Sequence, residues 1–187
     1  MKRQWLIPTI TVASLLLLAA TSAAASQPFY VKITGASQGV IEGGVTAGGR
    51  EGTIEGFEYH HLVEIPIDPG SGLPTGRAQH QVVIFTKEVD KATVNLWRAL
   101  DNGENLTKVE FMFYRVTNVG LQELYYKVTL TDAKVVALEP ITPHFRDADF
   151  IDFTDQERIR LNYRLIKVEF PSDGDEEHEL SSVDPGA

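Results

Sequence analysis

The sequence predicts a mainly β protein, an antiparallel two-sheet β-barrel that carries one α-helix. Short segments of alternating polarity recur along the chain, turn-forming residues separate them, and a single segment has helical spacing. Strands and helices do not alternate often enough for a parallel sheet. With 187 residues, of which 43% are hydrophobic, the chain can bury one sizeable core.

The N-terminal residues 1–25 are typical of a secretory signal peptide. Lys2 and Arg3 precede an apolar run over residues 6–20, and small residues follow it, with cleavage expected near Ala23, Ala25 and Ser26. The run is short for a membrane span, which needs roughly 20 residues. We therefore predict a secreted, extracellular protein, or a periplasmic one, without stable membrane insertion after cleavage. A retained anchor is the alternative.

Alternating polarity predicts the strands. Phe29, Val31 and Ile33 share one face of the first strand, over residues 29–34. A glycine-rich looped connection is expected from Gly35 to Gly52. Further strands are expected over residues 53–65, 80–86, 109–113, 122–131, 134–138 and 158–170. The last of these changes phase after Leu165, which a β-bulge near Leu165–Ile166 would explain.

Turn-forming residues crowd the segment from Pro66 to Gly76, which is expected to be a long protruding loop. It contains Ile67, Asp68, Pro69, Gly70, Ser71, Gly72, Leu73, Pro74, Thr75 and Gly76. Such long loops are often functional, and a plain surface loop is the alternative.

The single helix is expected from Asp90 to Asn102, with Asp90 as N-cap and Gly103 just past the end. Its apolar stripe is expected to contain Val89, Leu96, Trp97 and Leu100, with Trp97 anchored in the core. Pro171 is expected to close the domain that begins at residue 26. The acidic, polar residues 172–187 are expected to form a disordered tail.

The sequence indicates no catalytic site, cofactor or metal. It has no cysteine, and its five histidines match no metal-ligand motif; neighbours such as His60 and His61 on a strand point to opposite faces. The acidic run from Asp147 to Asp155 lacks the glycine and glutamate of an EF-hand loop. The glycines spell no phosphate-binding loop. We therefore predict that the protein is not an enzyme.

The charge balance favours protein partners. Lys2 and Arg3 account for two of the 17 basic residues, so the mature chain would carry 15 against 26 acidic residues, a balance of −11. A body of this charge is repelled by nucleic acid and by anionic lipid surfaces.

Residues 85–93, FTKEVDKAT, resemble the segment that leads into the single helix of the haemolysin-coregulated protein (Hcp) family, the tube proteins of type VI secretion systems. The opening strand FYVKI, the segment EGTIEGFEYH, a late hairpin YYKVTLTDAKV and the final strand IRLNY agree in order. The resemblance covers roughly residues 29–170.

The resemblance implies a small two-sheet barrel with one helix and a structural role. Subunits of this family form six-membered rings that stack into a tube within a contractile sheath, and the lumen can hold small effector proteins. The implied partners are further copies of the chain, effectors, and tube-tip or sheath proteins. The segment Ile67–Gly76 lies where the family has an extended loop that reaches the neighbouring ring.

Family members normally carry no signal peptide, so two further interpretations stay open beside the tube subunit. One is a stand-alone secreted or periplasmic relative that acts as a binding module without a contractile apparatus. The other is an enzyme with this fold, which the absence of a catalytic motif disfavours.

Overall fold

The computed structural model describes residues 27–144, 154–171 and 176–181. The predicted signal peptide, with Ala23, Ala25 and Ser26, lies outside the described residues, and so does the acidic run from Asp147 to Asp152. The elements are β1 (Phe29–Gly35), β2 (Gly39–Ile41), β3 (Ile54–His60), β4 (Val63–Glu64), β5 (Gln79–His80), β6 (Val83–Glu88), α1 (Ala92–Asp101), β7 (Leu106–Val116), β8 (Gln122–Ile141), β9 (Gln156–Asn162), β10 (Leu165–Phe170) and β11 (Glu176–Ser181).

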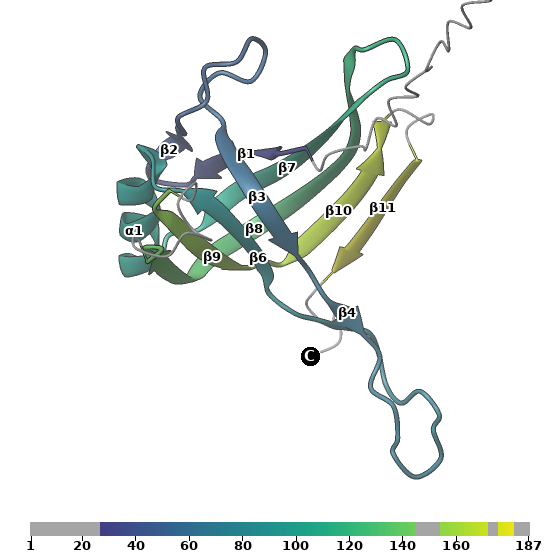
Figure 1. Ribbon diagram of the computed structural model, residues 1–187. Coiled ribbons are helices and arrows are strands. Elements are labelled where there is room, and N and C mark those ends of the chain that lie inside the picture. The colour runs from purple at the N-terminus through teal and green to yellow at the C-terminus, as the bar shows by residue number, and fades with distance from the viewer. Residues whose placement is uncertain (1–26, 145–153, 172–175, 182–187) are drawn as a thin grey trace, which may run out of the picture.

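Six strands close a barrel in the order β8-β7-β1-β3-β6-β9, and β9 pairs back onto β8 (Figure 1). Every pairing is antiparallel. The strands β10 and β11 extend the sheet beyond the barrel from β8, and β2 pairs with β1. The predicted fold class, a mainly β antiparallel barrel with one helix, is confirmed.

The barrel core is aromatic, and it follows from the alternation in the sequence. Phe29, Val31 and Ile33 are buried as predicted. The Phe29 ring lies 5.1 Å from that of Phe113 and 6.2 Å from that of Tyr59, measured between ring centroids. Gly56 faces Phe29 across the strands, and a Cβ atom there would come within 2.3 Å of the Phe29 ring. Glycine is therefore required for this close approach.

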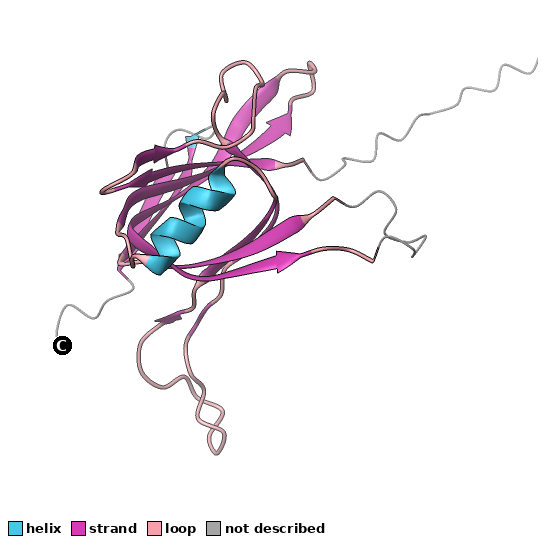
Figure 2. Cartoon of the chain, turned by 90° about the vertical axis from the view of Figure 1, so that its left-hand side faces the viewer, coloured by secondary structure: helices cyan, strands magenta, loops and turns pink. Residues whose placement is uncertain are grey.

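The helix α1 lies across one end of the barrel (Figure 2). Ala92, Leu96 and Ala99 recur at helical spacing and are fully buried. Trp97 is 42% exposed, so its predicted role as a core anchor is wrong. It lies one residue from Leu96, about 100° around the helix. The two small alanines, and not the indole, face the barrel interior.

The ends of the helix differ slightly from the prediction. The N-cap position belongs to Lys91, and Asp90 lies one residue earlier. The Asp90 carboxylate nevertheless accepts the amide of Ala92 at 2.9 Å, so it still satisfies a free donor of the first turn. Gly103 follows the C-cap with φ +59°, as predicted.

The two halves of the strand β8 have different partners. Its first half pairs with β7 and β10, and its second half pairs with β9. The predicted strands over residues 122–131 and 134–138 are therefore one continuous strand, and the expected hairpin within YYKVTLTDAKV does not form. Asp132 adopts φ +52° between the halves. It also pairs with Arg164, at 2.7 Å between Oδ2 and Nη2.

The predicted strand over residues 158–170 is divided into β9 and β10. The interruption falls at Tyr163 and Arg164, slightly before the predicted bulge, and the buried phase changes there from Leu161 to Ile166. The two strands separate because β9 pairs with β6 on its other side, whereas β10 pairs with β11.

Two segments expected to lack regular structure contain strands. The glycine-rich connection from Gly35 to Gly52 contains β2. Residues 176–181 of the predicted disordered tail form β11, with Leu180 packed against the core and Glu177 paired with Lys167. The acidic composition concealed this strand because it lies at the sheet edge, where charged side chains are common.

Candidate assembly site

The long loop, residues 65–78 between β4 and β5, extends away from the barrel, as predicted for Ile67–Gly76 (Figure 1). Its apolar side chains face solvent. Ile67 and Leu73 are each 63% exposed, and Ile65 is 48% exposed. Apolar side chains that project on a narrow loop are suited to contact with another molecule.

Internal hydrogen bonds give the long loop a defined shape. The Asp68 amide donates to the Leu73 carbonyl at 2.9 Å, and the Thr75 amide donates to the Pro66 carbonyl at 2.7 Å. Asp68 Oδ2 accepts the hydroxyl of Ser71 at 2.6 Å and its amide at 2.8 Å. These bonds hold the pKa of Asp68 below its ordinary value. A loop ordered in advance loses less entropy when it binds.

The stem of the long loop is fastened to the barrel by two histidines. His61 precedes β4 and His80 ends β5. Both reach the hydroxyl of Tyr163, which lies between β9 and β10. His61 Nε2 lies 2.6 Å and His80 Nδ1 lies 3.0 Å from Tyr163 Oη. The Gln81 amide also donates to the Leu62 carbonyl across the stem, at 2.9 Å. The exposed loop therefore ends in a partly buried polar anchor.

Burial sets the protonation states of this anchor. Burial lowers the pKa of His61, and the neighbouring His80 and His60 lower it further. Burial also raises the pKa of Tyr163 to about 12. At neutral pH the anchor therefore consists of a neutral His61 and a protonated tyrosine.

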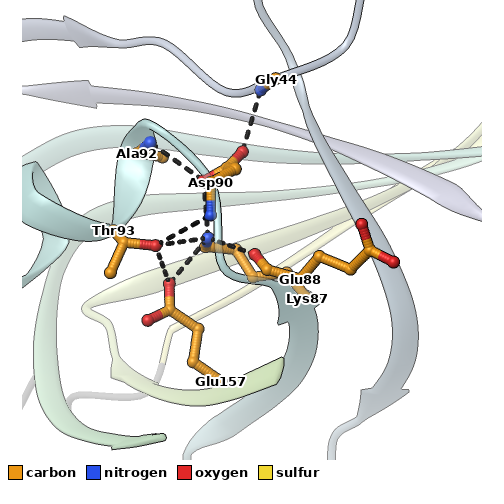
Figure 3. Close-up of polar contacts among 7 residues, drawn as sticks. All are labelled: Gly44, Lys87, Glu88, Asp90, Ala92, Thr93 and Glu157. Carbon is orange, nitrogen blue, oxygen red and sulfur yellow. Dashed lines mark hydrogen bonds and ion pairs between the residues drawn. The ribbon is translucent and has the colours of Figure 1, made fainter. Parts of the chain in front are cut away.

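A buried ion network fixes the joint between β6 and α1 (Figure 3). The Lys87 side chain is closed to solvent, and its Nζ lies 2.7 Å from both Asp90 Oδ1 and Glu157 Oε1. The Thr93 hydroxyl donates to Glu157 at 2.9 Å, and Asp90 Oδ2 accepts the Gly44 amide at 2.9 Å. The network therefore joins β6, the first turn of α1, β9 and the loop after β2. Three of its members, Lys87, Asp90 and Thr93, come from residues 85–93.

A cation–π contact fixes the loop between β2 and β3. The Arg50 guanidinium lies 4.7 Å from the ring centroid of Tyr30 and 4.3 Å from that of Tyr114. It also donates to the Gln122 side chain. The loop is thus held against β1, β7 and β8.

In residues 27–144, 154–171 and 176–181, no three or more His, Asp or Glu side chains are arranged to bind a metal. A hollow of about 270 Å³ is lined by Asp132, Lys134, Asn162, Tyr163 and Arg164, but the carboxylate and the guanidinium in it pair with each other. Over the same described ranges, no helix is long and apolar enough to cross a membrane.

Sequence reasoning located the long loop but not its anchor. His60 and His61 are neighbours in the sequence, but the structure brings His61 next to His80, with ring centroids 6.1 Å apart. The sequence does contain a signal for this anchor, because one of the two histidines precedes the predicted loop and the other follows it.

The sequence profile described as "Type VI secretion system effector, Hcp" matches residues 30–170. The chain belongs to the Hcp family. The "Major exported protein" of Pseudomonas aeruginosa is 40% identical to it over 148 residues, which cover 74% of this chain and 86% of that protein.

Solved structures of the Hcp family share the fold. The Hcp1 protein from the E. coli EAEC 042 pathovar superposes with a TM-score of 0.75 at 29% identity, over 83% of this chain and 99% of that one. The secreted protein Hcp3 from Pseudomonas aeruginosa superposes with a TM-score of 0.67 at 29% identity, over 82% and 99%. The barrel, the helix and the extra strands are therefore those of the Hcp fold.

Proposed function

We propose that the chain is a structural subunit that assembles with copies of itself into six-membered rings, which stack into the tube of a type VI secretion system. The observation that carries the proposal is the long loop. It is exposed, apolar and internally ordered, and it projects from a barrel of the Hcp family.

Contacts within a ring need free edges or complementary faces. The barrel strands are paired on both sides, so the described edges of the large sheet are those of β11 and the short β2. Closed barrels with short edges resist uncontrolled strand pairing and leave assembly to specific surfaces. This arrangement suits a subunit whose neighbours are fixed in number.

Light scattering and electron microscopy of the purified protein test the proposal. We expect rings at moderate concentration and stacked rings at high concentration. Replacing Ile67 and Leu73 with serine should leave rings intact and remove stacking. Replacing Val119, a still more exposed apolar residue on the β7–β8 turn, is the control and should preserve stacks. A monomer at high concentration would overturn the proposal.

The proposal includes small effector proteins as cargo in the ring lumen, and sheath and tube-tip proteins as further partners. These roles rest on family membership alone. Copurification of small proteins that is lost when rings are dissociated would support cargo binding.

The N-terminal segment favours a second candidate, a stand-alone exported relative that acts without a contractile apparatus. Lys2, Arg3 and the apolar run that follows have the features of an export signal. A reporter fused to residues 1–30 separates the two candidates. Export of the reporter favours the stand-alone protein, whereas retention of the reporter in the cytoplasm favours a subunit of the tube.

A further inference from the structure

A row of polar side chains crosses five strands of the large sheet, on the face opposite the core. The strand register places Lys32 on β1 opposite Glu110 on β7, and Glu110 opposite Thr129 on β8. Thr129 lies opposite Lys167 on β10, and Lys167 lies opposite Glu179 on β11. Residues opposite each other in antiparallel strands share a face. The row spans four strand spacings, roughly 19 Å.

Ion pairs join this row to charged neighbours on the same face. We call the set the charge ladder, which consists of the four charged residues of the row together with Lys108, Lys127, Glu169 and Glu177. In its middle, Lys127 Nζ lies 3.1 Å from Glu169 Oε2 and 3.7 Å from Glu110 Oε1. These three side chains are mostly buried, so the charges in the middle of the ladder neutralise one another.

The end of the ladder on β1 and β7 carries surplus positive charge, and we call it the basic end. Glu110 Oε1 is already shared by Lys108, at 2.8 Å, and by Lys127. Lys32, opposite Glu110, is exposed, and no ion pair joins it to a carboxylate in the part of the chain that the structure describes. On β1, β7 and β8 the ladder thus has three lysines and one glutamate, a balance of +2.

The end of the ladder on β10 and β11 carries surplus negative charge, and we call it the acidic end. Lys167 is already shared by Glu169, at 3.3 Å, and by Glu177. Glu179, opposite Lys167, is exposed and forms no ion pair with another described residue. The ladder has one lysine and three glutamates on these two strands, a balance of −2. The two ends are therefore equal and opposite in charge.

We propose that the acidic end of the charge ladder in one copy binds the basic end in the next copy, so that the copies join head to tail. The inference rests on the proposed function, in which copies form rings, and it names the two surfaces that meet within a ring.

The charges favour a second copy as the partner of each end. The whole chain has a formal net charge of −9, so the basic end differs from the body as a whole and is complementary to the acidic end. The strand β11 forms an edge of the sheet, where a neighbour can approach (Figure 1).

The charges also favour a head-to-tail contact over a two-fold contact. In a two-fold contact the same surface of both copies meets, so two acidic ends or two basic ends would face each other, and like charges at a contact repel. A contact between unlike ends repeats in one direction, and it closes into a ring when the rotation between copies divides a full turn.

Reversing the charge of either end tests the proposal. The first variant, Lys32→Glu with Lys108→Glu, gives a chain with two acidic ends. The second variant, Glu177→Lys with Glu179→Lys, gives a chain with two basic ends. Light scattering at increasing concentration measures assembly. For each variant alone we expect the concentration at half assembly to rise at least about tenfold, because like charges then face each other.

Mixing the two variants supplies the decisive measurement. In an alternating ring every acidic end meets a basic end, so the equimolar mixture should assemble as the parent protein does. With one variant labelled with nitrogen-15, native mass spectrometry should find three copies of each variant in a ring of six. Each substitution stays within its own chain in the mixture, so rescue cannot come from repair of the fold.

Matched controls carry the same change in charge outside the ladder. Lys91→Glu with Arg98→Glu reverses two exposed cations, and Glu42→Lys with Asp101→Lys reverses two exposed anions. Both should assemble as the parent protein does. Circular dichroism verifies the fold of every variant. If a double variant does not fold, the single substitutions Lys32→Glu and Glu179→Lys replace it, since neither residue forms an ion pair with another described residue.

The outcomes separate this inference from the proposed function. Rings in the parent protein, with either variant alone assembling equally well, would overturn the head-to-tail contact and leave the proposed function standing. A mixture of folded variants that stays unassembled would do the same. A parent protein that stays monomeric at high concentration would refute the proposed function, and the ring contact with it.

Discussion

Lys87 and Glu157 form a buried ion pair between two strands of the barrel wall, with 2.7 Å between Nζ and Oε1. The side chains are 0% and 1% exposed. Lys87 lies on β6 and Glu157 on β9, opposite each other in the strand register. The pair therefore lies where the barrel closes, and Asp90 extends it to the start of α1.

Removing one partner of this pair should strongly destabilise the protein. Lys87→Met leaves the Glu157 carboxylate buried without its cation, so we expect a loss of about 3–5 kcal/mol in the free energy of unfolding. Urea titration monitored by circular dichroism measures it. The double variant Lys87→Met with Glu157→Met should recover part of the loss, because no isolated buried carboxylate remains at position 157.

The exposed pair Lys91–Glu42 is the matched control for this prediction. Its N–O distance is 3.1 Å, but the side chains are 57% and 65% exposed. Glu42→Gln should change the free energy of unfolding by about 1 kcal/mol at most, since water screens exposed pairs. Equal losses from Lys87→Met and Glu42→Gln would contradict the importance of the buried network.

Gly56→Ala should disturb the aromatic core. The new methyl group would come within 2.3 Å of the Phe29 ring, which is confined by neighbouring aromatic rings. We expect a loss of about 1–3 kcal/mol, the usual cost of overpacking. Gly48 lies in an open loop, where an added Cβ atom would meet no heavy atom within 4 Å apart from its chain neighbours. Gly48→Ala should therefore leave the urea midpoint of unfolding nearly unchanged.

The two neighbouring residues Leu96 and Trp97 should differ in how much their truncation destabilises the protein. Leu96 is fully buried under the helix, so Leu96→Ala should cost about 2–5 kcal/mol. Trp97 is 42% exposed, and Trp97→Ala should cost less than Leu96→Ala despite the larger deletion. Thermal unfolding of both variants decides between this structure and a helix anchored by its tryptophan.

Glu104 should contribute to the acid stability of the protein. Its Oε1 accepts the amides of Ser37 at 2.8 Å and Gln38 at 2.9 Å. Burial raises its pKa, but the hydrogen bonds from Gln38 and Ser37 outweigh burial and hold the pKa below the ordinary value. The contribution of Glu104 to the stability of the fold is thus present above about pH 4.5, and it is lost as the pH falls through the lowered pKa of this carboxyl group.

Unfolding midpoints between about pH 6 and 3 test the role of Glu104, since this interval spans the titration of carboxylates. The midpoint of the parent protein should fall more steeply toward acid than that of Glu104→Gln, whose amide does not titrate. Parallel curves for the two proteins would contradict the assignment.

The sequence predicted the features of the fold that depend on interactions between residues close together in the chain. The alternation of Phe29, Val31 and Ile33 predicted which face is buried. The phase change near Leu165 indicated an irregularity, which the structure shows to be a break between β9 and β10 and not a bulge within one strand. Gly103 predicted the end of the helix because its left-handed conformation favours glycine there. Each of these features depends on a few consecutive residues.

Features that depend on distant residues were missed. Trp97 looked like a core anchor, but the space beneath the helix accommodates Ala92 and Ala99 and excludes an indole. The edge strand β11 is defined by its partner β10 and not by its own acidic sequence. His61 and His80 meet only because β4 pairs with β5. No local pattern contains these pairings.

The closing strand β9 has a consequence for the kinetics of folding. Barrel closure requires β9 to pair with both β6 and β8, and β9 begins only at Gln156, late in the chain. Pairings between distant segments form slowly, since the chain must lose loop entropy before the contacts form. A chain still emerging from a ribosome or a translocation channel therefore cannot complete the barrel. The topology therefore delays completion of the fold, and the chain can still pass through a channel for most of its synthesis.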